Sequence, residues 1–338
     1  MAKNIKAYAV KDARSALVPF EFKVGDLGPD EVEIAVESCG VCHSDLSMIE
    51  NQWGMSQYPL VPGHEVVGTI AARGDRVPHL ERGQRVGLGW YARSCMHCAS
   101  CLRGDHNLCE TGQGTIVGRH GGFADTVRCH WAWATPLPPG LDIESAGPLF
   151  CGGITVFNPI VQNNVKPTDR VGVVGIGGLG HLGLQFLAKW GCEVTAFTSS
   201  ANKAEEATRF GAHHIVDSRD AAALDAAAGT LDFLLVTVNV PLDWERYVNT
   251  LGPKGRLHLV GAVLEPIPVS AFGLITKQRS ISGSPLGSPA TNIDMLSFCN
   301  RHQIRPQIET YPMSSINDAL EHLRAGKARY RIVLKNDF

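Results

Sequence analysis

The stretch Arg170–Trp190 reads RVGVVGIGGLGHLGLQFLAKW and decides the fold of the region around it. A strand-like apolar run ends in a glycine-rich turn, and a helix-like segment, Leu179–Trp190, follows. In such a turn Gly175 permits the sharp bend, Gly177 lets backbone approach a pyrophosphate, and Gly180 lets the helix pack close to the strand. Unpaired N–H groups at the helix start would face phosphates. The order strand, turn, helix favours a dinucleotide-binding turn over a merely structural one, with contacts expected at Gly175, Gly177, Gly178, Leu179 and Gly180.

The segment after the next expected strand bears on the choice of dinucleotide. An acidic residue there would hydrogen-bond the ribose 2′-hydroxyl of NAD and repel a 2′-phosphate. This chain has Thr198, Ser199, Ser200 and Lys203 instead. Hydroxyls, unpaired N–H groups at a helix start and an ammonium can all bind a phosphate, so we expect NADP(H). Alternatively, Ser199 or Ser200 is only the N-cap of the following helix.

Outward from this turn, strand-like and helix-like segments alternate. Such alternation predicts parallel βαβ units, and hence an α/β fold with a Rossmann, doubly wound parallel sheet over residues 154–288. The expected strands are Arg170–Ile176, Glu193–Phe197, His213–Asp217, Asp232–Val238 and Arg256–Val260. Residues 1–153 contain short strand-like segments bounded by Gly, Pro or Asp, which predict a β-rich domain. In residues 289–338 a helix is expected over Asn317–Ala325, and Arg331–Lys335 could be a strand that rejoins the first domain.

The length, composition and charge of the chain limit its possible partners. A chain of 338 residues with 44% hydrophobic and 19% charged residues predicts a folded protein of two domains. The 31 basic and 33 acidic residues nearly cancel, which gives no electrostatic reason to expect nucleic acid or an anionic membrane as partner. No signal-like or membrane-spanning run is visible, so we expect a cytoplasmic protein. In that compartment ten cysteines indicate metal binding more than disulfides.

Four of the cysteines are closely spaced: Cys95, Cys98, Cys101 and Cys109. Four thiolates can close a tetrahedral shell around Zn²⁺ without an open position, which is a structural site. The residues between them are mostly polar, so zinc would supply the folding energy that burial cannot. A redox CxxC pair is the alternative, but it leaves two thiols unexplained.

Three further polar clusters lie far apart in the sequence, at Cys39–Asp45, Gly63–Gly68 and Cys151–Thr155. Each is weak evidence alone, because buried cysteines and histidines are common. Beside a nicotinamide domain they favour a second zinc ion with three protein ligands and one position open to water or substrate. The expected ligands are Cys42, His64 and Cys151.

The pattern Gly63-His64-Glu65-x2-Gly68-x5-Gly74-x2-Val77 resembles the zinc signature of the medium-chain alcohol dehydrogenases, and the likeness extends over essentially the whole chain. The cysteine quartet matches that family's structural-zinc lobe in spacing. The runs around Cys42–Asp45 and Tyr58–Glu65 resemble the cinnamyl alcohol dehydrogenase branch. Cys151–Phe157 and the ending Gly326–Arg331 are similar to bacterial NADPH-dependent aldehyde reductases of broad substrate range.

The resemblance implies a GroES-like catalytic domain in residues 1–153, with a structural-zinc lobe at about residues 90–112. It implies that Glu65 is an exchangeable ligand beside the catalytic zinc, that Ser44 passes a proton, and that Asp45 orients His64. Many relatives carry a histidine five positions after Cys42. This chain has Ser47 there, so the proton relay ends in Ser47 or in water.

The same resemblance implies contacts with the cofactor. His43 would lie near the pyrophosphate and Thr155 against the nicotinamide ring. One of Arg329 and Arg331 would also reach the pyrophosphate. The carboxamide side would be lined by Val260, Gly261 and Ala262.

Together these features predict reversible, NADPH-linked reduction of aliphatic and aromatic aldehydes to primary alcohols, with two zinc ions per chain, by a homodimer acting on a small molecule. Trp53 and Trp90 are candidates for the substrate wall, although such aromatics are often plain core. Two alternatives remain: a polyol or secondary-alcohol dehydrogenase of the same fold, and a non-catalytic protein that binds zinc and dinucleotide.

Overall fold

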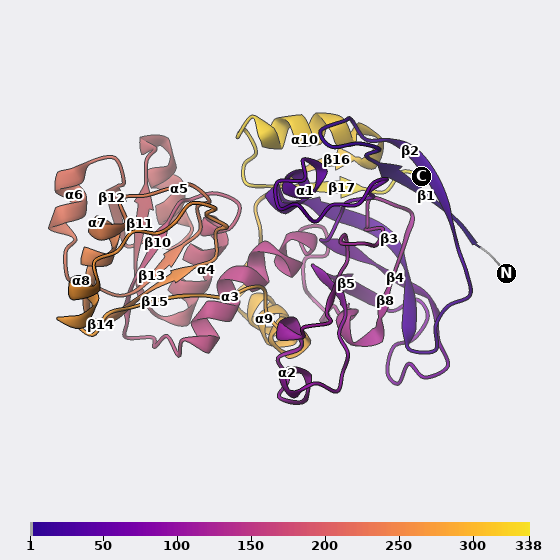
Figure 1. The fold of residues 1–338 in the computed structure, drawn as a ribbon, viewed down its shortest axis with the longest axis horizontal. Helices are drawn as coiled ribbons and strands as arrows, with labels where there is room; N and C mark the ends of the chain where they lie inside the picture. Colours follow the sequence, from indigo (N-terminus) through magenta and orange to yellow (C-terminus); the bar gives the residue numbers. More distant parts are fainter. Residues whose placement is uncertain (1–2) are drawn as a thin grey trace. The chain divides into compact units, whose positions relative to one another are not determined.

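The computed structural model of the chain describes residues 3–338. Two compact units make up the fold (Figure 1). The first comprises the chain up to Ile154 together with Leu286–Phe338, and the second is Thr155–Pro285. None of the described helices is long and apolar enough to cross a bilayer.

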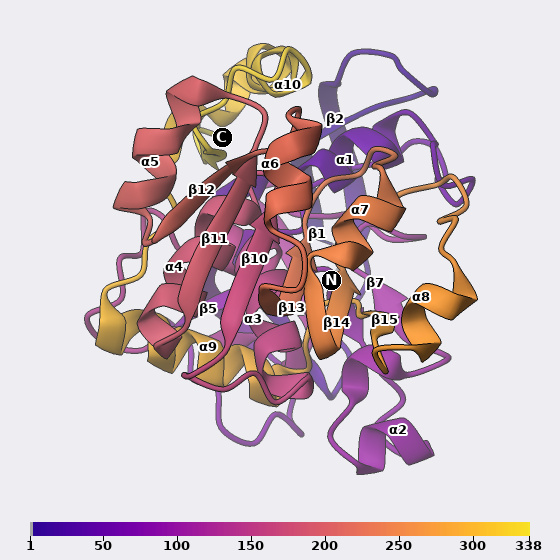
Figure 2. The same cartoon turned by 90° about the vertical axis from the view of Figure 1, so that its left-hand side faces the viewer.

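The second unit contains a six-stranded parallel sheet in the order β12-β11-β10-β13-β14-β15, and Figure 2 shows its strands side by side. The strand order reverses between β10 and β13, the switch point where open α/β sheets bind ligands beyond their carboxyl ends. The strands are β10 (Arg170–Val174), β11 (Glu193–Thr198), β12 (His214–Asp217), β13 (Leu231–Val236), β14 (Leu251–Leu259) and β15 (Ser280–Gly283). The predicted doubly wound parallel sheet is confirmed.

Helices cover both faces of this sheet because side chains alternate along its strands. Leu234 and Val236 of β13 pack with buried residues of α6 and α7. Leu235 points the other way, and its Cδ2 lies 3.4 Å from the position that a Cβ would take on Gly183 of α4. The helices of this unit are α3 (Gly152–Gln162, which starts in the first unit), α4 (Gly180–Trp190), η4 (Ala201–Lys203), α5 (Ala204–Arg209), α6 (Ala221–Ala226), α7 (Trp244–Asn249) and α8 (Ala271–Ile275).

The first unit is built around a sheet ordered β16-β17-β3-β4-β5-β9, with β8 also paired to β3. Its strands are β3 (Glu31–Val41), β4 (Val66–Arg73), β5 (Arg85–Leu88), β8 (Thr126–His130), β9 (Thr135–Pro136), β16 (Ile308–Pro312) and β17 (Arg331–Lys335). β17 runs antiparallel to β3, with Ile332 opposite Val41. The chain's last strand therefore lies in the sheet of the first unit.

Smaller elements complete the first unit. β1 (Lys3–Ala9) and β2 (Val18–Val24) form a hairpin, and β6 (Tyr91–Arg93) pairs with β7 (Gln113–Gly114). The helical segments are α1 (His43–Ile49), α2 (Ala99–Leu102), η1 (His106–Leu108), η2 (Trp131–Trp133), η3 (Gly147–Phe150), α9 (Pro289–His302), η5 (Met313–Ser315) and α10 (Ile316–Arg324).

The sequence pattern does not predict α9, although it is the longest of the described helices. The reason lies in which of its residues are buried. Asn292 is buried on the inner face, whereas the neighbouring Ile293 is 53% exposed. The apolar residues of this helix therefore coincide only in part with its buried face, and the sequence shows no clear helical pattern.

Candidate active site and metal centres

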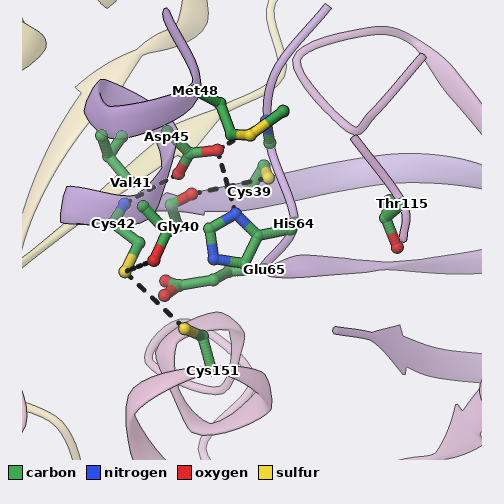
Figure 3. Close-up of polar contacts among 12 residues, drawn as sticks. Cys39, Gly40, Val41, Cys42, Asp45, Met48, His64, Glu65, Thr115 and Cys151 are labelled. Carbon is green, nitrogen blue, oxygen red and sulfur yellow. Dashed lines mark hydrogen bonds and ion pairs between the residues drawn. The ribbon is translucent and has the colours of Figure 1, made fainter. Parts of the chain in front are cut away.

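Four side chains from distant parts of the sequence meet in the first unit. Cys42 is the N-cap of α1, His64 and Glu65 precede β4, and Cys151 lies between η3 and α3. One ligand atom from each lies within 4.8 Å of the others, and all four residues are buried. Figure 3 shows their side chains turned toward one small space. Strand pairing explains part of this convergence, because β3 and β4 pair at Cys39 and Val66, just before Cys42 and just after Glu65.

Asp45 fixes the orientation of His64. Its Oδ1 lies 3.0 Å from His64 Nδ1 and accepts the N–H of Gly63 at 2.9 Å, while Oδ2 accepts the N–H of Cys42 at 2.9 Å. Burial lowers the pKa of His64, but the Asp45 carboxylate outweighs it and holds that pKa well above its ordinary value. Because a carboxylate only accepts, Nδ1 carries a proton, and Nε2 is directed to the thiols. Nε2 has no hydrogen-bond partner among the described residues.

The two thiols of this cluster lie 3.6 Å apart. The contact between them lowers the pKa of Cys42 well below its ordinary value and raises that of Cys151 well above it, because one proton is shared between two buried sulfurs. A second thiolate in this buried space needs a positive charge beside it. Two sulfurs and an imidazole nitrogen are the donors that zinc prefers, and three of them leave one coordination position open. The donor set therefore fits the predicted catalytic zinc.

Arg331 holds Glu65 beside this donor set. In the sequence Arg331 is one of two candidates for a contact with the pyrophosphate. Oε1 of Glu65 pairs with Nη2 of Arg331, and both side chains are buried. Burial raises the pKa of Glu65 to about 7, and the Arg331 charge opposes the rise. The other oxygen, Oε2, has no hydrogen-bond partner among residues 3–338. Glu65 is therefore placed where it could serve as an additional oxygen donor, and its role as an exchangeable ligand stays a prediction.

The cysteine quartet forms a second donor cluster in the first unit. The sulfurs of Cys95, Cys98, Cys101 and Cys109 lie within 4.8 Å of one another. The N–H groups of Cys95 and Cys98 each donate to a sulfur of the quartet at 3.3 Å. Such bonds stabilise thiolates, and bonds from backbone N–H groups, first that of His97, lower the pKa of Cys95 to about 6. All ten cysteines are free, so a disulfide does not compete with metal here.

In the second unit the glycine turn joins β10 to α4. Gly175 has φ +88°, and a Cβ on Gly180 would lie 1.9 Å from Gly175 O, so neither position accepts a larger residue. A Cβ on Gly177 would meet nothing within 4 Å, which leaves space for a ligand against the backbone. The N–H groups of Ile176, Gly177, Gly178 and Leu179 donate no hydrogen bond within the part of the chain that is described. Gly177, Gly178 and Leu179 are half-buried, and N–H groups without a partner at a helix start fit a pyrophosphate.

The residues expected to read the 2′-phosphate follow β11. Ser199 is exposed and Ser200 half-buried, while Thr198 Oγ1 accepts the N–H of Ser200 at 3.3 Å. Lys203 does not extend into solvent, because its Nζ donates to Ile176 O of the glycine turn at 2.9 Å. The Lys203 ammonium therefore lies between the glycine turn, where the pyrophosphate is predicted to bind, and the turn after β11, where the 2′-phosphate is predicted to bind. Val260, Gly261 and Ala262 follow β14 at the same edge of the parallel sheet, and Thr155 lies in the first turn of α3.

Comparison with known proteins identifies the family of this chain. Models of two protein families match it, the alcohol dehydrogenase GroES-like domain over residues 28–139 and the zinc-binding dehydrogenase over residues 178–301. An aldehyde reductase, AdhA, of Synechocystis is 57% identical over 98% of this chain and 99% of its own length. The chain belongs to the zinc-binding alcohol dehydrogenase family. This dehydrogenase is thus an oxidoreductase, and its predicted GroES-like and Rossmann domains are confirmed.

Solved structures place the dehydrogenase in the cinnamyl alcohol dehydrogenase branch. The cinnamyl alcohol dehydrogenase SbCAD4 of Sorghum bicolor is 36% identical, with a TM-score of 0.94 over 98% of both chains. The enzyme called CAD from Helicobacter pylori, solved with NADP(H), is 28% identical, with a TM-score of 0.91 over 99% of both chains. The predicted family and branch are confirmed.

In the dehydrogenase one of the predicted proton-relay residues, Ser44, lies beside the donor cluster. Ser44 Oγ lies 3.7 Å from the sulfur of Cys42, and His43 is exposed. Ser47 is buried, and its hydroxyl donates to Gln52 Oε1 at 2.9 Å. The hydroxyl proton of Ser47 is thus directed to Gln52.

Two tryptophans stand beside the metal donors. The ring of Trp90 meets the imidazole of His64 edge-on at 5.1 Å, and Trp53 meets Trp90 at 5.8 Å. The predicted substrate-wall residues therefore lie next to the donor cluster. Their contact with a substrate stays a prediction.

Sequence reasoning did not find the partner of Glu65. The resemblance implies that one of Arg329 and Arg331 reaches a pyrophosphate, and that contact stays a prediction. Local pattern gives no signal for this ion pair, because four consecutive residues of β17 are buried. The pairing of β17 with β3 brings Arg331 to Val41 O and to Glu65.

Proposed function

We propose that this dehydrogenase reversibly reduces aliphatic and aromatic aldehydes to primary alcohols with NADPH. The observation that carries the proposal is the buried cluster of Cys42, His64 and Cys151, in which Nε2 of His64 has no hydrogen-bond partner among the described residues. Such a cluster is costly to bury without a cation. Its three donors would leave one coordination position of a tetrahedral metal ion open. The name of AdhA, an aldehyde reductase, supports aldehydes as substrates.

Zinc at these ligands supplies Lewis-acid polarisation of the carbonyl oxygen, and NADPH supplies the hydride. The side chains of the protein supply position and protons. Asp45 holds His64 in one tautomer and orientation, so the donor atoms are preorganised. The Ser44 hydroxyl, beside Cys42, gives a proton to the oxygen that becomes the alcohol. Trp90 and Trp53 provide an apolar wall that favours aldehydes with hydrocarbon chains or rings over sugars.

NADPH is the proposed cofactor because the turn after β11 offers one cation, Lys203, and several hydrogen-bond donors, and no carboxylate. Ser199, Ser200 and Lys203 stand where an acidic residue would select NAD. A relative from Mycobacterium tuberculosis, 35% identical over 98% of both chains, is named an NADP-dependent alcohol dehydrogenase. That relative and the NADP(H) complex of the Helicobacter pylori enzyme support the same cofactor here.

The proposal includes two zinc ions per chain, the second held by the cysteine quartet as a structural ion. It includes a cytoplasmic location, where these thiols stay reduced. It also includes a homodimer, because the second unit exposes large apolar side chains whose burial against another copy would be favourable. They are Leu264, Phe272 and Ile275.

An initial-rate assay tests the proposed reaction. We expect turnover of benzaldehyde and hexanal with NADPH, much slower turnover with NADH, and little reduction of acetone. Dialysis against a zinc chelator should abolish the activity, and added Zn²⁺ should restore it. Oxidation of sorbitol with NADP⁺, without turnover of either aldehyde, would show a polyol dehydrogenase instead. Full activity after complete removal of zinc would refute the metal's role.

A further inference from the structure

Side chains bind the carbonyl groups of four consecutive residues of the glycine turn, Val174 to Gly177. Thr237 Oγ1 contacts Val174 O at 2.9 Å and Gly175 O at 2.8 Å. Lys203 Nζ donates to Ile176 O at 2.9 Å. His181 Nδ1 lies 3.0 Å from Gly177 O and must donate, because a carbonyl oxygen only accepts. We call Thr237, Lys203 and His181 the carbonyl clamp.

The carbonyl clamp helps to determine where the opposite side of each peptide points, together with the backbone N–H groups of Thr237 and His181, which donate to Val174 O and Gly177 O at 3.1 Å. A trans peptide is planar, so its C=O and the N–H of the next residue point in opposite directions. Holding the carbonyls of Gly175, Ile176 and Gly177 therefore directs the N–H groups of Ile176, Gly177 and Gly178 away from the clamp. These are N–H groups that donate no hydrogen bond within residues 3–338.

Thr237 is central to this arrangement. Its Oγ1 lies 3.3 Å from the positions that a Cβ would take on both Gly175 and Gly180. Glycine at these two positions thus leaves room for a hydroxyl on the inner side of the turn. Thr237 follows β13, the strand beside β10 at the switch point of the sheet.

We propose that Thr237 is a positioning residue for the pyrophosphate of the cofactor, acting through the glycine turn without touching the ligand. The inference rests on the proposed binding of a nicotinamide dinucleotide. Its hydroxyl holds the turn in the conformation in which the N–H groups converge on the phosphates before the ligand arrives. Preorganised donors bind more tightly because less ordering is left for the binding step.

Binding titrations of NADPH and NADH to three variants of the full chain test the proposal. Thr237→Val removes the hydroxyl and keeps the shape of the side chain, and Thr237→Ser keeps the hydroxyl. Thr250→Val is the matched control, because the buried Thr250 hydroxyl donates to Tyr247 O at 2.7 Å in the same unit and makes no contact with the turn. Thermal unfolding of each variant measures the structural effect separately.

We expect Thr237→Val to raise the Kd of NADPH and of NADH by the same factor, about 5- to 10-fold, since both ligands carry the pyrophosphate. At saturating NADPH its kcat should stay within about twofold of wild type, because the metal donors lie in the other unit. Thr237→Ser should restore most of the affinity. Thr250→Val should lower the unfolding temperature and leave both Kd values unchanged.

Four results would overturn the proposal. They are an unchanged Kd in Thr237→Val, a loss confined to NADPH, an equal loss in Thr250→Val, and failure of Thr237→Ser to restore binding. Wild-type protein that binds neither dinucleotide would instead refute the proposed function itself, so the two failures are distinguishable.

Discussion

Asp45 and His64 are both fully buried, and the Oδ1 of the carboxylate lies 3.0 Å from Nδ1 of the imidazole. The same carboxylate accepts the N–H groups of Gly63 and Cys42. One side chain thus fixes the backbone on both sides of the proposed zinc site and the orientation of its histidine. A change at Asp45 should therefore weaken metal binding although Asp45 itself is not a ligand.

Asp45→Asn should lower zinc affinity or kcat/KM by about 10- to 100-fold, because the neutral amide no longer supports the basicity of His64. Zinc retained after graded chelation and the kcat/KM for benzaldehyde measure the two effects. Wild-type values for both would contradict the proposed role of the carboxylate.

Arg331→Met should destabilise the protein by about 3–5 kcal/mol, because the buried Glu65 loses its ion-pair partner. The shift of the urea unfolding midpoint measures the loss. The double variant Glu65→Gln/Arg331→Met is the control, and it should recover part of the stability because no buried charge is left unpaired. A single variant as stable as wild type would show that the pair is not needed.

Ser199→Asp should raise the KM for NADPH by at least about 10-fold and leave the KM for NADH unchanged or lower. The new carboxylate would repel the 2′-phosphate and could accept a hydrogen bond from a ribose hydroxyl. Initial rates with varied cofactor measure both constants. Equal losses for the two cofactors would mean that this turn does not read the phosphate.

Cys98→Ser should remove the structural zinc and lower the unfolding temperature by about 5–10 °C, because the quartet region has few buried apolar residues to replace the metal. Zinc analysis should then find about one ion per chain fewer than in wild type. Unchanged zinc content and unchanged thermal stability would argue against a structural ion in the quartet.

The sequence predicted best what depends on local pattern. The glycine turn, the alternating strands and helices of the second unit and the return of Arg331–Lys335 to the first sheet all follow from spacing and periodicity. The grouping of Cys42, His64 and Cys151 was inferred from chemistry, since nothing in their spacing shows that residues 109 positions apart lie 3.6 Å apart at their sulfurs.

The contacts that were missed depend on tertiary packing. Arg331 faces Glu65 only because β17 pairs with β3 in one particular register. Thr237 reaches the glycine turn because β13 lies beside β10, an order that the sequence does not state. The polar Asn292 is buried in α9, where polarity alone predicts exposure.

Zinc content per chain, measured together with activity in Cys151→Ser, tests the central claim most directly. Cys192→Ser is the matched control, since Cys192 is a buried cysteine outside both clusters. We expect about two zinc ions in wild type and in Cys192→Ser, and about one in Cys151→Ser, with kcat/KM for aldehyde reduced by about 1,000-fold or more in Cys151→Ser. A Cys151→Ser protein that keeps both ions and wild-type activity would contradict the account.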